Sequence, residues 1–139
     1  MKKELRCIML VDDDEHDNFF HEREIYKTNL ETIVIKKTSG FDALKYLKSM
    51  KENKETKPDL IFLDINMPNV DGWEFLLEFS QLDKEIQNGI MIMMLTTSRN
   101  PADRLRVKAW NYVSGFLNKP LTKEILDDII KTYFKERQN

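Results

Sequence analysis

Residues 58–68 read PDLIFLDINMP, and they say more about the architecture than any other part of the chain. Four apolar residues, Leu60 to Leu63, run without interruption between Asp59 and Asp64. A short run that is apolar throughout is typical of a strand buried on both faces, since a buried helix segment is usually longer. The stretch therefore predicts a central strand of a parallel sheet, with Asp64 at its carboxyl end.

Two similar runs lie on either side of this strand in the chain, at Cys7–Val11 and Ile90–Leu95. Two weaker strand candidates complete the set. Thr32–Thr38 is rich in β-branched residues, and Ser114–Asn118 is a short segment that ends before a Lys-Pro pair. The sequence therefore predicts five strands.

Apolar residues at helical spacing fill the segments between and after these strands. The predicted helices are Asp17–Asn29, Phe41–Met50, Trp73–Leu82, Pro101–Trp110 and Thr122–Phe134. Thr122 is expected to cap the last of them. Strands that alternate with helices predict an α/β fold with helices on both faces of the sheet. We expect a flavodoxin-like (βα)5 three-layer sandwich, whose parallel five-stranded sheet has the order 2-1-3-4-5.

The composition is that of an ordinary globular domain. A chain of 139 residues predicts one domain, residues 1–139, with a core over about residues 5–136. Its 41% hydrophobic residues are too many for a disordered chain. The net charge of −2 argues against direct nucleic-acid binding through bulk charge. One cysteine and two histidines exclude an internal disulfide and argue against a structural zinc site.

The apolar runs are too short for targeting or membrane insertion. Cys7–Val11 falls short of the roughly 7–15 residues of a secretory signal core. Ile90–Leu95 is far below the ~20 residues that cross a bilayer. The sequence therefore predicts a cytoplasmic protein that does not associate with a membrane.

Polar side chains follow four of the predicted strands at the point where each strand ends. Residues 12–14 are all aspartates, Asp64 follows the third strand, Thr96 the fourth, and Lys119 the fifth. The carboxyl ends of parallel strands meet at one edge of a sheet, so these groups are expected to converge. Two carboxylates ~4 Å apart repel by about 4 kcal/mol at an effective dielectric of 20, so such a cluster needs a cation or a proton. Mg²⁺ prefers such oxygen ligands, and a bound phosphoryl oxygen would complete its coordination.

Each of these residues also has an ordinary interpretation. An acidic run such as residues 12–14 favours the start of a helix through capping and the helix dipole. Asp64 alone is a common turn residue, Thr96 a strand-end group, and Lys119 a solvated lysine. Only their joint placement at the ends of neighbouring strands favours a functional site.

Five short motifs together carry a resemblance to a known family. They are LVDDD at 10–14, PDLIFLDINMP at 58–68, DG at 71–72, LTTS at 95–98 and GFLNKP at 115–120. In this order and spacing the chain resembles response-regulator receiver domains, the CheY-like family, from about Leu5 to Phe134. Because no further domain is evident after the last helix, the resemblance is to the stand-alone, single-domain type.

The resemblance implies a Mg²⁺ site at the acidic cluster. It assigns Asp13 as a direct ligand, Asp12 as a ligand acting through water, and Asp64 as a shared ligand. Asn66, two residues after Asp64, would offer its backbone carbonyl. Asp14 lies one place beyond the acidic pair and is expected to begin the following helix.

The resemblance also implies a phosphoryl-accepting reaction. Asp64 would be the phosphoacceptor, Thr96 would hydrogen-bond a phosphoryl oxygen, and Lys119 would pair with Asp64 before phosphorylation and with the phosphoryl group afterwards. The family's switch couples the Thr96 hydroxyl to an aromatic residue, here Phe116, which lacks a hydroxyl of its own. A cis bond at Lys119-Pro120 is expected on the same ground.

The implied partners are a sensor histidine kinase or a histidine phosphotransfer protein upstream, and an effector protein downstream. The signal would leave through a face made of residues 101–110, 114–118 and 122–134, and a phosphorylation-dependent homodimer through this face is left open. The protein would be no metabolic enzyme, since it would catalyse only its own phosphorylation and dephosphorylation.

Other functions fit the sequence less well. A flavodoxin-like cofactor binder needs a Ser/Thr/Gly-rich phosphate loop where this chain has acids after the first strand. A phosphohydrolase with an aspartyl nucleophile usually has a second acid where this chain has Asn66. An EF-hand at residues 12–17 lacks the glycine at its sixth position. An interaction module that uses the same fold without phosphorylation is left open.

Overall fold

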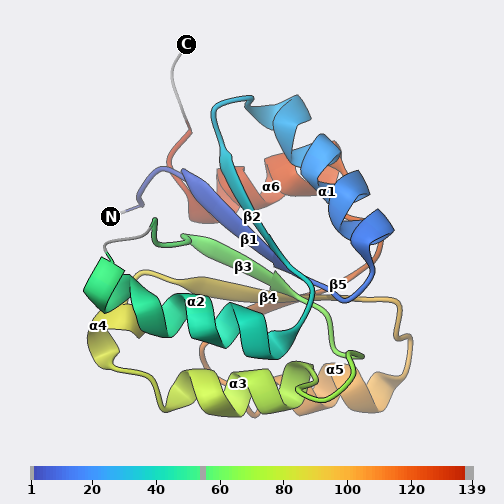
Figure 1. Cartoon of the computed structure of the whole chain (residues 1–139). Helices are drawn as coiled ribbons and strands as arrows, with labels where there is room; N and C mark the ends of the chain where they lie inside the picture. Colours follow the sequence, from blue (N-terminus) through green and yellow to red (C-terminus); the bar gives the residue numbers. More distant parts are fainter. Residues whose placement is uncertain (1, 54–55, 137–139) are drawn as a thin grey trace.

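The structure is a computed structural model that describes residues 2–53 and 56–136. Eleven elements follow one another within these described residues (Figure 1). They are β1 (Cys7–Val11), α1 (Glu15–Thr28), β2 (Ile33–Lys37), α2 (Gly40–Asn53), β3 (Leu60–Leu63), α3 (Gly72–Ser80), α4 (Lys84–Gln87), β4 (Met91–Thr96), α5 (Pro101–Val107), β5 (Val113–Asn118) and α6 (Lys123–Tyr133).

The five strands form one parallel sheet of order β2-β1-β3-β4-β5. Helices α1 and α6 cover one face, and α2, α3 and α5 cover the other (Figure 1). These three layers confirm the predicted flavodoxin-like α/β fold and its 2-1-3-4-5 sheet.

The core is divided between the two faces because side chains alternate along each strand. Met9 and Ile61 point into the cluster under α2 and α3. Their neighbours Ile8 and Phe62 point into the cluster under α1 and α6. All four are at most 1% exposed, and each such burial contributes roughly 1.5–3 kcal/mol. The predicted central strands are therefore buried on both faces.

Most helix boundaries lie one to three residues from the predicted ones. Helix α1 begins at Glu15 rather than at Asp17, because the Asp14 carboxylate caps it by accepting from the His16 and Asp17 amides. Helix α5 ends at Val107, and the chain then tightens into turns through residue 110. The short α4 was not predicted. The predicted cap at Thr122 is confirmed, since its hydroxyl accepts from the Ile125 amide at 3.3 Å.

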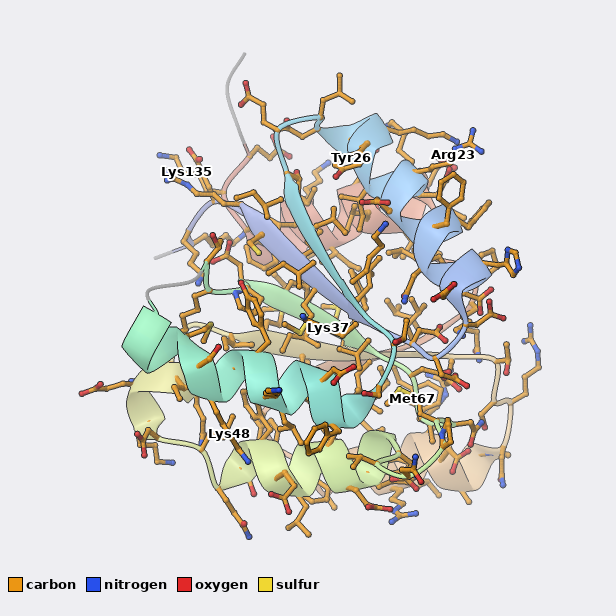
Figure 2. The ribbon with its side chains drawn as sticks, viewed as in Figure 1. Arg23, Tyr26, Lys37, Lys48, Met67 and Lys135 are labelled. Atoms are coloured by element: carbon orange, nitrogen blue, oxygen red, sulfur yellow. The ribbon has the colours of Figure 1, made fainter. Side chains whose placement is uncertain are left out.

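All strand carboxyl ends point to one edge of the sheet, at the right of Figure 1. The loops after β1, β3, β4 and β5 meet there. Figure 2 places Met67 in the loop after β3 at this edge, and its side chain is only 7% exposed. Because that loop packs inward, it is held in a defined position beside the strand ends.

Candidate functional site

Three of the predicted aspartates come together at this edge. One carboxylate oxygen each from Asp12, Asp13 and Asp64 lies within 4.8 Å of the others. Asp12 and Asp64 are buried at 4% and 6% exposure, whereas Asp13 is exposed. This set of hard oxygen donors, open to solvent on one side, fits a Mg²⁺ ion that keeps part of its water shell.

Lys119 reaches the same group from β5. Its Nζ lies 2.6 Å from Asp12 Oδ2, 2.8 Å from Asp17 Oδ2 and 3.5 Å from Asp64 Oδ2. The Lys119 amide donates to the Thr96 carbonyl at 2.9 Å, which fixes the lysine backbone against β4. The predicted contact between Lys119 and Asp64 is therefore present, but it is the longest of the three. The contact with Asp17 was not predicted.

Burial and charge act against each other in this cluster. Burial raises the pKa of both the Asp12 and the Asp64 carboxyl above its ordinary value, and the Lys119 ammonium offsets part of that effect. Burial by itself lowers the pKa of Lys119, but hydrogen bonds to Asp12 and Asp17 outweigh it and raise that pKa. The lysine is thus held as an ammonium ion beside the two buried carboxylates, and its charge offsets part of the cost of burying them.

The backbone around Asp64 is fixed by the loop that follows it. The Asn66 amide hydrogen-bonds to the Asp64 carboxylate, while the Asn66 side chain is exposed. The Gly72 amide donates to the Ile65 carbonyl at 2.8 Å. A Cβ atom on Gly72 would lie 2.7 Å from the Asp64 carbonyl oxygen and 2.8 Å from Ile65 Cα. Only glycine permits this close approach, which ties the start of α3 to the backbone of Asp64.

The two predicted switch residues lie on neighbouring strands. Thr96 ends β4 fully buried, and its Oγ1 accepts from the Ser98 amide at 3.2 Å. Phe116 lies on β5 opposite Met94, half-buried, with the Arg104 guanidinium of α5 4.8 Å from its ring centroid. The threonine hydroxyl is therefore tied to the loop after β4, whereas the phenylalanine is tied to α5.

Sequence reasoning missed three residues of α1 that complete the site. Asp17 binds Lys119, and Asn18 donates through Nδ2 to the Asp12 carbonyl at 3.0 Å. His21 is 2% exposed, and burial lowers its pKa to about 4. The apolar pattern predicted this helix from Asp17 onward, although Asp14 was expected to begin it. The cap at Asp14 confirms the earlier start, which brings Asp17 and Asn18 against the end of β1.

The expected cis peptide bond is present at Lys119-Pro120. Among the described residues, no helix combines the length and the apolar character that crossing a bilayer requires.

The family model for the response regulator receiver domain matches residues 8–131. The chain therefore belongs to the family of response regulator receiver domains of two-component systems, which confirms the resemblance drawn from the motifs.

Individual relatives agree with this family. The chain is 30% identical to the response regulator Rcp1 of Synechocystis sp. over 70% of its own length and 66% of that protein. It is 27% identical to the polar-differentiation response regulator DivK of Brucella ovis over 92% of its length and 95% of that protein. Its match to the probable methanogenesis regulatory protein FilR2 of Methanothrix harundinacea spans 54% of that relative. The matched part is thus less than two thirds of both Rcp1 and FilR2.

Solved structures give the same fold. A two-component response regulator from Cytophaga hutchinsonii superposes with a TM-score of 0.83 at 28% identity, over 94% of this chain and 98% of that one. The Mn²⁺-bound form of Rcp1 superposes with a TM-score of 0.75 at 25% identity, over 96% and 97% of the two chains.

Proposed function

We propose that this receiver domain accepts a phosphoryl group on Asp64 from a phosphohistidine of a sensor histidine kinase or a histidine phosphotransfer protein. One observation carries the proposal: a buried carboxylate at the end of β3 lies within reach of both an acidic cluster and a partly buried ammonium group. A carboxylate held among oxygen donors for a cation, with a fixed positive charge beside it, is suited to phosphoryl transfer.

In the proposed step an Asp64 oxygen forms a bond to phosphorus while the phosphorus–nitrogen bond of the donor breaks. The donor's ring nitrogen keeps the electron pair, and a ring whose other nitrogen carries a proton leaves as neutral imidazole. The product on Asp64 is an acyl phosphate. Lys119 and the Thr96 hydroxyl would bind its oxygens. Thr96 ends β4, which pairs with β3, and Lys119 directly follows β5, which pairs with β4. Beyond this self-catalysed transfer and the hydrolysis of the acyl phosphate on Asp64 we propose no enzymatic activity.

Mg²⁺ is the proposed cofactor, held by Asp12, Asp13, Asp64 and the backbone carbonyl of Asn66. When bound it would neutralise charge on the carboxylates and the phosphoryl oxygens. The solved Mn²⁺-bound form of the relative Rcp1 supports the binding of a divalent ion. Burial raises the pKa of Asp12 and Asp64, and a divalent cation beside them would favour their charged form.

The proposed output is a change of the face made by α5, β5 and α6, the segments that the sequence assigned to partner docking. A dianionic group at Asp64 would draw the Thr96 hydroxyl and the loop after β4 toward it, and α5 follows that loop directly. Phe116 would respond through packing, since it has no hydroxyl to bond. An effector protein, or a second copy of the chain, would bind the changed face. We propose that phosphorylation and effector binding take place in the cytoplasm.

The test is incubation with acetyl phosphate and Mg²⁺, read by intact mass. We expect a gain of one phosphoryl group that is lost in Asp64→Asn and kept in Asp42→Asn, a control on the first turn of α2. Removal of the metal with EDTA should abolish the gain. No gain from acetyl phosphate or from a phosphorylated phosphotransfer protein would instead favour an interaction module that works without phosphorylation.

A further inference from the structure

The Lys119 ammonium forms its two short ion pairs with carboxylates other than the proposed phosphoacceptor, Asp64. Its two short contacts, 2.6 and 2.8 Å, go to Asp12 and Asp17, while Asp64 lies at 3.5 Å, the outer limit for a hydrogen bond. The ammonium is therefore held toward α1 and away from the end of β3.

Asp17 is suited to holding it there. Its amide donates to the Asp14 cap at 3.2 Å, so it lies in the fixed first turn of α1. Its side chain is 37% exposed, whereas that of Asp64 is 9% exposed. Its charge therefore costs little desolvation. Asp17 is also not one of the three aspartates whose oxygens gather within 4.8 Å, so its carboxylate faces the lysine rather than the proposed metal position.

We propose that Asp17 is a positioning residue that draws the Lys119 ammonium off Asp64 and so leaves the Asp64 oxygens open to the divalent cation. An ammonium and a Mg²⁺ ion compete for the same carboxylate oxygens, since each neutralises their charge. Without Asp17, the ammonium keeps only Asp12 and Asp64 as partners and closes on Asp64. This inference rests on the proposed function, because it concerns the metal site of the same reaction.

The experiment measures Mg²⁺ binding by calorimetry, with no phosphodonor present. Asp17→Asn is expected to raise the dissociation constant about three- to fivefold, the upper end of what a partly exposed ion pair contributes. Glu15→Gln removes the same charge from the same helix turn, where the structure gives the side chain no contact with Lys119. It is expected to change binding less than about twofold.

A double-mutant cycle separates positioning from simple charge removal. In a Lys119→Met background, Asp17→Asn should weaken binding no more than Glu15→Gln does, because the competing ammonium is gone. An equal effect of Asp17→Asn in both backgrounds would overturn the inference, as would equal effects of Asp17→Asn and Glu15→Gln in the unsubstituted chain. Thermal unfolding of each variant checks that the fold is kept.

The outcome is distinguishable from failure of the proposed function, because phosphorylation is read separately by mass. A chain that binds Mg²⁺ with the expected cycle but never gains a phosphoryl group would refute phosphoryl acceptance and leave the role of Asp17 standing. A chain that is phosphorylated normally but shows no coupling between Asp17 and Lys119 would refute the role of Asp17 and leave phosphoryl acceptance standing. A chain that binds no Mg²⁺ would overturn both metal assignments.

Discussion

Replacing Gly72 with alanine should disturb both the stability of the fold and the position of Asp64. The added Cβ would lie 2.7 Å from the Asp64 carbonyl oxygen and 2.8 Å from Ile65 Cα, and both atoms belong to the backbone. A backbone cannot give way by rotating a side chain, so the loop after β3 must shift. Overpacking of this kind costs roughly 1–3 kcal/mol, and two backbone contacts favour the upper half of that range.

Helix propensity works in the opposite direction. Alanine is better than glycine inside a helix by about 0.8–1 kcal/mol, and Gly72 is the first residue of α3. The net loss should therefore be about 1–2 kcal/mol, which corresponds to a melting temperature lower by roughly 3–8 °C for a domain of this size. Because the shift moves the Asp64 backbone, phosphorylation by acetyl phosphate should slow by about tenfold or more.

Gly115→Ala is the matched control. Its Cβ would meet only the flexible Met93 side chain, at an ordinary 3.6 Å. Both substitutions reduce the entropy of the unfolded chain by the same amount, so the difference between them reports the contact at Gly72 less the helix propensity gained there. Circular dichroism melts of the two variants provide the assay. If Gly72→Ala melted at or above Gly115→Ala, the steric reasoning would be refuted.

Three further predictions concern α1, α6 and α5. The folded-state pKa of His21, about 4, lies below its ordinary 6.5, so the unfolded chain binds more protons between these values. Stability should thus fall by about 3 kcal/mol as the pH drops through that window, and urea titrations of His21→Leu should lack this component. Thr122→Ala should lose about 1 kcal/mol of unfolding free energy with its cap, whereas Thr132→Ala, exposed on the same helix, should lose none. Arg104→Ala should cost about 0.5–1 kcal/mol in denaturant unfolding, and that cost should vanish in a Phe116→Leu background; its persistence there would contradict the cation–π contact.

The sheet was predictable because its central strands are continuous apolar runs in the sequence. Leu60–Leu63 is apolar at every position, and the structure buries every one of these side chains. The edge strand β2 is less distinct, since Ile33 is 47% exposed and two lysines end the strand. Its predicted range, Thr32–Thr38, was correspondingly one residue too long at each end. Helix α4 escaped prediction because it is a single turn in which Ile86 is the one buried residue.

The site was predictable to the extent that it lies on strand ends. Asp12, Asp64, Thr96 and Lys119 each follow or close a strand, so topology alone brings them to one edge. The partner of Lys119 on α1 was not predictable in this way. Which side chain of a helix turns back over a sheet depends on the residue where the helix begins. The apolar pattern predicted this helix only from Asp17, two residues after its first residue, Glu15.

The residue after Gly72 is a tryptophan whose fluorescence can report on the site. Trp73 comes next in the chain, is 8% exposed, and has the Arg106 guanidinium of α5 4.3 Å from its ring centroid. Its indole thus links the acceptor's loop to the helix through which the signal is proposed to leave. The sequence holds two tryptophans, so Trp110→Phe would leave Trp73 as a single intrinsic fluorophore. Stopped-flow emission would then follow movement between these two segments without an added dye.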